Sequence, residues 1–198
     1  MAFLPSVASR RGHFKTESGY HSDLWMDLET LCRRPALVQP LTQELARRLA
    51  GCEVDAVCGP LNEGAFVALM VAAELGCDFT YAERIVSPER DALYPVRYTL
   101  PTPLRPIVAN RRVAIVNDVI SAGSAVRGAF ADLDAAGACV VAIACLLVLG
   151  EAIDAFAAER GVRLETLERS PYQLWAPSDC PLCRSGVPLD SLTLTPDS

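Results

Sequence analysis

The chain has 198 residues, of which 51% are hydrophobic and 21% are charged. This balance predicts one globular domain with a sizeable core and excludes an intrinsically disordered chain. The formal net charge of −6 argues against general nucleic-acid binding, and Lys15 is the only lysine in the chain. Arginine therefore has to supply almost all of the positive charge.

The compartment is predicted from the N-terminus and from the cysteines. The first residues lack the basic region, apolar run and small-residue cleavage site of a signal peptide, and the longest apolar stretch, residues 138–150, is too short to span a bilayer. The eight cysteines are scattered, and Cys58, Cys139 and Cys145 lie inside apolar runs. The cysteines are therefore predicted to be reduced, with these three in the core, in a cytoplasmic protein that does not act at a membrane.

The first elements are a polar hairpin and a long helix. Residues 14–25 contain a turn signal at Ser18-Gly19, which predicts a hairpin that packs on the protein or on a partner chain. Residues 35–49 predict a helix that begins at a proline and ends before Gly51. One apolar face of this helix is predicted to consist of Leu37, Leu41, Leu45 and Leu49.

A strand–loop–helix unit follows, and then an irregular segment. A strand is predicted over residues 54–58, a glycine-bounded loop over 59–65 and a helix over 66–75; the next strand covers 79–82. From there to residue 111 the chain carries five prolines with interspersed arginines. A loop of this length is usually functional or disordered, and a mobile flap and a static flap both remain open.

The most informative stretch lies between residues 111 and 127. Residues 113–116 predict a buried strand, the polar pair Asn117 and Asp118 follows it, and Ser121-Ala122-Gly123-Ser124 form a small-residue loop. A helix is predicted over 125–136, with Val126, Phe130 and Leu133 on one face. Unpaired backbone amides at the start of a helix favour anions, so this unit predicts a phosphate site.

The remaining elements continue the alternation of strands and helices. A strand is predicted over residues 139–149, a helix over 153–160 and a strand over 162–167, which gives a mostly parallel sheet with ligand sites at its carboxyl edge. The tail carries Cys180 and Cys183, which are half of a zinc site, and both histidines are distant in sequence. Structural and metal-binding roles remain open, and the flanking prolines argue against a thioredoxin-like helix start.

Three segments carry a family resemblance. Residues 116–125 resemble the phosphoribosyl-pyrophosphate (PRPP) signature of the type I phosphoribosyltransferases. The segment with Phe14, Ser18, Gly19, His21 and Ser22 resembles the N-terminal hood of orotate phosphoribosyltransferases, and the tail with Cys-Pro-Leu-Cys resembles the C-terminus of some bacterial ones. The resemblance implies an α/β fold of this type: a hood at 1–34, a mostly parallel core flanked by helices at 35–170 with a flexible loop at about 83–111, and a tail at 171–198.

The resemblance also implies a function. It implies transfer from PRPP to orotate in de novo pyrimidine nucleotide biosynthesis, with Mg²⁺ bound through PRPP, in a homodimer. Asp118 and Arg84 are the implied catalytic residues, and Asp118 also faces the PRPP-bound Mg²⁺. The implied substrate-binding residues are Lys15, Trp25, Pro60, Asn62, Arg97, Asn117, Ser121, Ala122, Gly123, Ser124 and Ala125.

Three positions depart from the family pattern. Glu17 stands where the family has a basic residue, Asn117 stands in place of an acid, and Leu149 stands in place of the arginine that grips the orotate carboxylate. Lys15, two residues from Glu17 and on the same face of a strand, is the candidate replacement cation. Two alternatives therefore stay open: a transferase for a different base, and a catalytically impaired regulatory protein that binds PRPP or a nucleotide.

Overall fold

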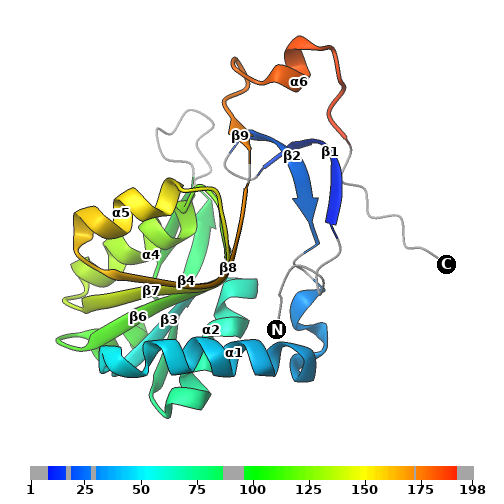
Figure 1. Cartoon of the computed structure of the whole chain (residues 1–198). Coiled ribbons are helices and arrows are strands. Elements are labelled where there is room, and N and C mark those ends of the chain that lie inside the picture. Colours follow the sequence, from blue (N-terminus) through cyan, green and yellow to red (C-terminus); the bar gives the residue numbers. More distant parts are fainter. Residues whose placement is uncertain (1–8, 17–18, 28–29, 87–95, 172, 191–198) are drawn as a thin grey trace.

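The computed structural model describes residues 9–16, 19–27, 30–86, 96–171 and 173–190. These residues form a six-stranded sheet in the order β5-β4-β3-β6-β7-β8 and a separate three-stranded sheet in the order β1-β2-β9. In the larger sheet only the β4–β5 pair is antiparallel. Figure 1 shows helices on both faces of the larger sheet and the smaller sheet standing beside it. The predicted α/β architecture is confirmed.

The core elements have the following bounds. The strands are β3 (Ala56–Pro60), β4 (Asp78–Val86), β5 (Val96–Thr99), β6 (Arg112–Ile120), β7 (Cys139–Leu149) and β8 (Arg163–Ser170). The helices are α1 (Pro35–Leu49), α2 (Glu63–Leu75), α3 (Arg105–Val108), α4 (Ser124–Ala135) and α5 (Ala152–Arg160), with short 3₁₀ turns at Leu31–Arg33, Ala50–Cys52 and Thr102–Leu104. Helix α1 and strand β7 have the bounds that the sequence predicts, 35–49 and 139–149.

Two apolar layers hold the larger sheet. On one face α1 and α2 bury Leu45, Leu49 and Val71 against the sheet. On the other face α4 and α5 bury Leu133 and Ile153 among others. Each such side chain contributes about 1.5–3 kcal/mol when it is fully removed from water, so the two layers fix the positions of the strands between them.

The hood is the second structural unit. It consists of β1 (Ser9–Lys15), β2 (His21–Met26), β9 (Leu174–Trp175) and the short helix α6 (Pro181–Arg184). Because β9 follows β8 after only a few residues, the tail enters the hood from the carboxyl edge of the larger sheet (Figure 1). Leu24 and Met26 pack in the same apolar layer as α1 and α2, which anchors the hood to the core.

Some expectations about single residues were wrong. Leu37 is 60% exposed, because Val38 takes the inward position in the first turn of α1. Cys139 is exposed rather than buried, since it is the first residue of β7. Glu17 lies outside the described residues.

The irregular segment expected at about 83–111 is shorter than predicted. β4 continues to Val86, β5 returns antiparallel to it, and helical turns cover Thr102–Leu104 and Arg105–Val108. The remainder, 87–95, lies outside the described residues. None of the helices in the described part of the chain combines the length and the apolar character that crossing a bilayer would need.

Candidate active site

The site lies where two neighbouring strand–loop–helix units end. β3 and β6 are parallel neighbours, with Ala56 opposite Val113 and Cys58 opposite Ile115. The loop that leads from β3 into α2 and the loop that leads from β6 into α4 therefore meet at the same edge of the sheet. Ligands of open α/β sheets bind at this edge.

The loop after β6 has the geometry of a phosphate cradle. Gly123 has a φ of +79°, a conformation that favours glycine, and a Cβ added there would lie 3.0 Å from Ile153 Cδ1 and would have to displace that side chain. α4 begins at Ser124, and the amide of Arg127 donates to the Gly123 carbonyl at 2.9 Å. The first amides of an α-helix have no partner within the helix, so those at the start of α4 are available to an anion. The loop is open to solvent: Ser124 is exposed, and Ser121, Ala122 and Ala125 are half-buried.

Asn117 lies in the gap between the two units. It is 8% exposed, and its Nδ2 donates to the Val119 carbonyl at 2.9 Å. A Cβ on Gly64 would overlap its Oδ1 atom, so α2 can approach β6 this closely only because residue 64 is glycine. Asn117 therefore contacts the first turn of α2 with its amide oxygen.

Asp118 is a buried carboxylate beside this contact. It is 6% exposed, and burial raises its pKa from 3.8 to about 7. The Val119 amide lowers this pKa, whereas the carboxylate of Glu63 raises it. Glu63 is the first residue of α2, so its electrostatic effect on Asp118 brings a second acid to the site. Sequence reasoning missed Glu63, although an acid directly after the Gly-Pro-Leu-Asn loop was a usable signal.

The second loop contributes backbone. Pro60 is buried as the last residue of β3, and the Leu61 amide donates to the Ala82 carbonyl at 2.9 Å. The peptide between Leu61 and Asn62 is cis, and Asn62 is exposed immediately before α2. The predicted binding residues Pro60 and Asn62 thus lie at the same edge as Asp118.

Arg84 and Arg97 lie on the extension of β4 and on its return strand. Ala82 is the last residue of β4 that pairs with β3, and Arg84 lies two residues beyond it, opposite Tyr98. Arg97 is opposite Ile85 on β5, and both arginine side chains are exposed. Both residues therefore lie beyond the carboxyl end of β3, but their side chains are on opposite faces of the β4–β5 ribbon, because Arg97 pairs with Ile85, the neighbour of Arg84.

The hood carries the other two predicted substrate-binding residues. Lys15 is exposed at the end of β1, opposite His21. Trp25 is half-buried on β2, with its ring centroid 6.2 Å from that of Phe14. Both residues belong to the hood rather than to the two core loops.

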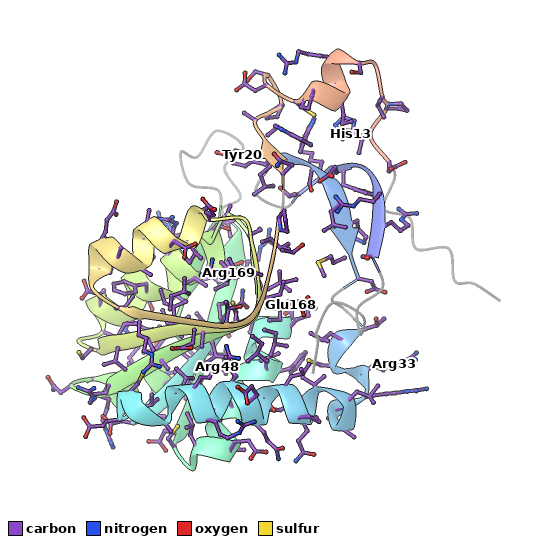
Figure 2. The ribbon with its side chains drawn as sticks, viewed as in Figure 1. His13, Tyr20, Arg33, Arg48, Glu168 and Arg169 are labelled. Atoms are coloured by element: carbon purple, nitrogen blue, oxygen red, sulfur yellow. The ribbon has the colours of Figure 1, made fainter. Side chains whose placement is uncertain are left out.

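Leu149, at the position where the resembled family has an arginine, and its neighbour Val148 are apolar and buried. Val148 and Leu149 are 0% and 5% exposed at the end of β7. The residue opposite Val148 on β8 is Arg169, which Figure 2 labels. Its guanidinium donates to both carboxylate oxygens of Asp154, at 2.8 and 3.0 Å, so Arg169 is already paired within the chain.

The cysteine pair lies away from this edge, in the hood. Cys180 is buried and Cys183 is exposed. Cys180 contacts His13, and Cys183 contacts both His13 and His21. The sequence distance of the histidines was therefore misleading. The proline argument was also wrong, because Pro181 begins the short helix α6 directly after Cys180.

Comparisons with known proteins agree on one family. The sequence profile described as "Phosphoribosyl transferase domain" matches residues 28–163. The chain is 31% identical to an orotate phosphoribosyltransferase of Pelotomaculum thermopropionicum over 94% of this chain and 90% of that protein. It is 30% identical to an orotate phosphoribosyltransferase of Desulforamulus reducens, with coverage of 94% and 90%.

A solved structure supports the fold. The crystal structure of the orotate phosphoribosyltransferase from Aeropyrum pernix superimposes with a TM-score of 0.61. The match covers 83% of this chain and 88% of that chain, at 24% sequence identity. At that identity the superposition establishes a common fold and nothing finer.

Proposed function

Because this chain belongs to the phosphoribosyltransferase family, we propose that it transfers the phosphoribosyl group of PRPP to orotate, releasing pyrophosphate and orotidine 5′-monophosphate. One observation carries this proposal. The small-residue loop at the start of α4 and the buried carboxylate of Asp118 lie together at the carboxyl edge of the sheet, in a chain about 30% identical to orotate phosphoribosyltransferases. De novo pyrimidine nucleotide biosynthesis is the corresponding role.

The residues of the two loops divide the work on PRPP. The amides and hydroxyls of residues 121–125 hold the 5′-phosphate, and Asp118 accepts hydrogen bonds from a ribose hydroxyl. We assign the pyrophosphate to the loop with Pro60 and Asn62 together with Arg84 and Arg97. Positioning and charge stabilisation then account for the rate, with no requirement for a side-chain base.

The reaction exchanges one bond at C1 of the ribose for another. The bond between C1 and the pyrophosphate oxygen breaks, positive charge develops at C1, and a ring nitrogen of orotate forms the new bond and loses its proton to solvent. An ionised Asp118 stabilises the developing charge. Mg²⁺ held with PRPP would lower the pKa of Asp118 from its raised value, because a nearby cation favours the ionised carboxylate.

The acids at the site fit Mg²⁺. Carboxylate oxygens are the hard ligands that Mg²⁺ prefers, usually one or two of them together with substrate phosphates and water. Asp118 and Glu63 are two neighbouring carboxylates at this edge, and they would hold the ion with PRPP. When bound, Mg²⁺ neutralises charge on the pyrophosphate.

Glu63 also bears on the missing acid at position 117. The first turn of α2 contacts Asn117 through Gly64, and Glu63 directly precedes that contact. Its carboxylate already acts on Asp118 electrostatically. We therefore assign to Glu63 the second negative charge that the family's acid pair supplies.

A rescue experiment tests the assignment of Glu63. Glu63→Gln should lower kcat/KM for PRPP by about 10- to 100-fold, the effect of removing one charged contact to the transition state. Adding Asn117→Asp should restore part of the loss. Glu74→Gln is the matched control, since Glu74 lies near the far end of α2 and pairs with Gln43. Full activity of Glu63→Gln, or no rescue, contradicts the assignment.

Recognition of the base requires a cation from outside the end of β7. An orotate carboxylate needs a cation or a pair of donors to offset its desolvation, and Leu149 supplies neither. We assign Lys15 in the hood as the cation for this carboxylate and Trp25 as the side chain that stacks on the ring. The apolar end of β7 favours a second candidate, transfer to a base that lacks the carboxylate.

Titration calorimetry with a base panel separates these functions. PRPP with Mg²⁺ and orotidine 5′-monophosphate should each bind, and pyrophosphate release should be supported by orotate and not by uracil or adenine. Pyrophosphate release with uracil and not with orotate would mean that the substrate is a base without the carboxylate. Binding of PRPP without release on any base would favour the regulatory protein, and absence of PRPP binding would overturn the proposal.

Two further properties are proposed with the function. The homodimer is supported by apolar side chains that are at least half exposed on α1 and α2, namely Leu37, Phe66 and Leu69, and light scattering in solution measures it directly. A cytoplasmic location is supported by the cysteines, all eight of which are unpaired. Cell fractionation tests the location.

A further inference from the structure

Four side chains from the two ends of the chain converge inside the hood. His13 and His21 come from the β1–β2 hairpin, and Cys180 and Cys183 come from the tail around α6. One nitrogen or sulfur atom of each side chain lies within 4.8 Å of the corresponding atom of every other. Figure 2 places His13 between the hairpin and the segment that carries α6. We propose that these residues bind one structural Zn²⁺ ion.

The distances match a tetrahedral site. Zinc bonds of about 2.0–2.1 Å to nitrogen and 2.3 Å to sulfur require edges of roughly 3.3 Å between nitrogens and 3.6 Å between nitrogen and sulfur. His13 Nε2 lies 3.0 Å from His21 Nδ1, 3.4 Å from Cys180 Sγ and 3.7 Å from Cys183 Sγ. His21 Nδ1 lies 3.2 Å from Cys183 Sγ. These four distances are within about 0.4 Å of the tetrahedral edges, and all six lie within 4.8 Å.

The ring of His13 is oriented by the tail. Its Nδ1 lies 2.8 Å from the Val187 carbonyl, and a carbonyl can only accept, so Nδ1 carries the proton. The lone pair of the neutral ring is therefore on Nε2, the atom that faces the other three ligands. A backbone carbonyl that fixes the tautomer in this way is the usual second partner of a metal-bound histidine.

The charges of the four ligands suit a buried divalent cation. Two thiolates and two neutral imidazoles cancel the charge of Zn²⁺, so the loaded cluster is neutral. That neutrality matters because His13, His21 and Cys180 are 1%, 6% and 0% exposed, and a buried net charge would be costly. All four positions are taken by protein atoms, which is the arrangement of a structural zinc rather than a catalytic one.

The surrounding contacts close the tail around His13. The Asp190 amide donates to the His13 carbonyl at 2.7 Å, and the His13 amide donates to the Asp190 carboxylate at 3.1 Å. A Cβ on Gly12 would overlap that carboxylate, so the approach requires glycine there. The ion would join residues more than 150 positions apart, so its binding to the folded chain alone would stabilise the contact between the two ends of the chain.

Metal analysis of the intact protein tests the site. Protein purified without chelator should contain about one zinc per chain, and a thiol-modifying mercurial should release it. Cys183→Ser and His13→Asn should lose most of that zinc. Cys139→Ser is the matched control, because Cys139 is an exposed cysteine at the start of β7 and should leave the zinc content unchanged.

Cobalt provides an independent test if a ligand variant fails to fold. Replacing the metal with Co²⁺ in the wild-type chain should give the visible absorption of a tetrahedral site and a thiolate charge-transfer band. Zinc-free protein that does not take up either ion, or a Cys180–Cys183 disulfide in the freshly purified protein, overturns the proposal. Each readout concerns metal content, so it is independent of transferase activity.

Discussion

The two sites of this molecule differ in how their polar groups are used. At the carboxyl edge of the core, the amides at the start of α4 and the acid Asp118 are the groups that we assign to a ligand. In the hood, His13, His21, Cys180 and Cys183 turn their ligand atoms toward one another. An open arrangement suits a substrate that must enter and leave, and a closed arrangement suits an ion that stays.

The largest effect is expected from removing the buried charge at the open site. Asp118→Asn should lower kcat by about 100- to 1,000-fold, the loss seen when one preorganised electrostatic contact to a transition state is removed. The 5′-phosphate contacts remain, so PRPP affinity should change much less. Pyrophosphate release under saturating substrate measures this. Asp134→Asn is the control, since Asp134 is exposed near the end of α4, and equal activity of both variants would refute the role of Asp118.

The same carboxylate predicts a dependence of stability on pH. Burial raises the pKa of Asp118 from 3.8 to about 7, so between these values the folded protein holds a proton that the unfolded chain releases. The free energy of unfolding should therefore fall as the pH rises from about 4 to 7, by roughly 2–4 kcal/mol in the absence of ligand.

Urea unfolding at pH 5 and pH 8 measures this effect. Asp118→Asn should show a smaller decrease between the two pH values than the wild type, and it should be the more stable protein at pH 8. Asp134→Asn should retain the wild-type decrease. A decrease of the same size in Asp118→Asn would mean that other groups cause it.

A third prediction separates backbone strain from the phosphate site. Gly123 and Gly137 both have a φ of +79°, but only Gly123 has neighbours within 4 Å of an added Cβ. Alanine at either position should cost about 1–2 kcal/mol of stability through the left-handed conformation. Only Gly123→Ala should also weaken PRPP binding, by about tenfold or more, because it shifts the amides of the loop. Calorimetry and denaturation on both variants decide this, and equal PRPP affinities would contradict the assignment of the cradle.

The smallest predicted effect concerns the closed site. Removing metal with a chelator should speed hydrogen exchange at amides that join the tail to β1, such as those of His13 and Asp190, by about tenfold. Amides in β6 and β7 should exchange as before, because the buried core layers hold these strands. Faster exchange throughout the core would mean that the ion stabilises the whole fold rather than the hood.

The two sites also differ in how far the sequence predicts them. The helix at 35–49, the strand at 139–149 and the loop before α4 follow from short segments, since apolar spacing, proline and glycine act on their near neighbours. Leu37 shows the limit of that reasoning: it has the four-residue spacing of the apolar face, but in the first turn of α1 the buried position belongs to Val38. Cys139 is likewise at the start of its element, where β7 begins, and is exposed.

Contacts between segments that are distant in the chain could not be predicted from such short-range patterns. Nothing near Cys180 indicates which residues complete its site, because His13 reaches it only through the packing of the tail on the hairpin. Glu63 begins α2, directly after β3, and Asp118 lies in the neighbouring strand β6, so their proximity depends on the register of β3 with β6. The sequence shows the acid Glu63 and the pair Cys180 and Cys183, but it does not show which residues lie beside them.

The central claim is that the open edge of the core carries out transfer to orotate. The most direct test is to follow orotate consumption and pyrophosphate formation together, with PRPP and Mg²⁺, for the wild type and for Asp118→Asn. We predict equal molar amounts of the two changes in the wild type, orotidine 5′-monophosphate as the product, and almost none with the variant. Bound PRPP with no orotate consumed by the wild type would contradict the account.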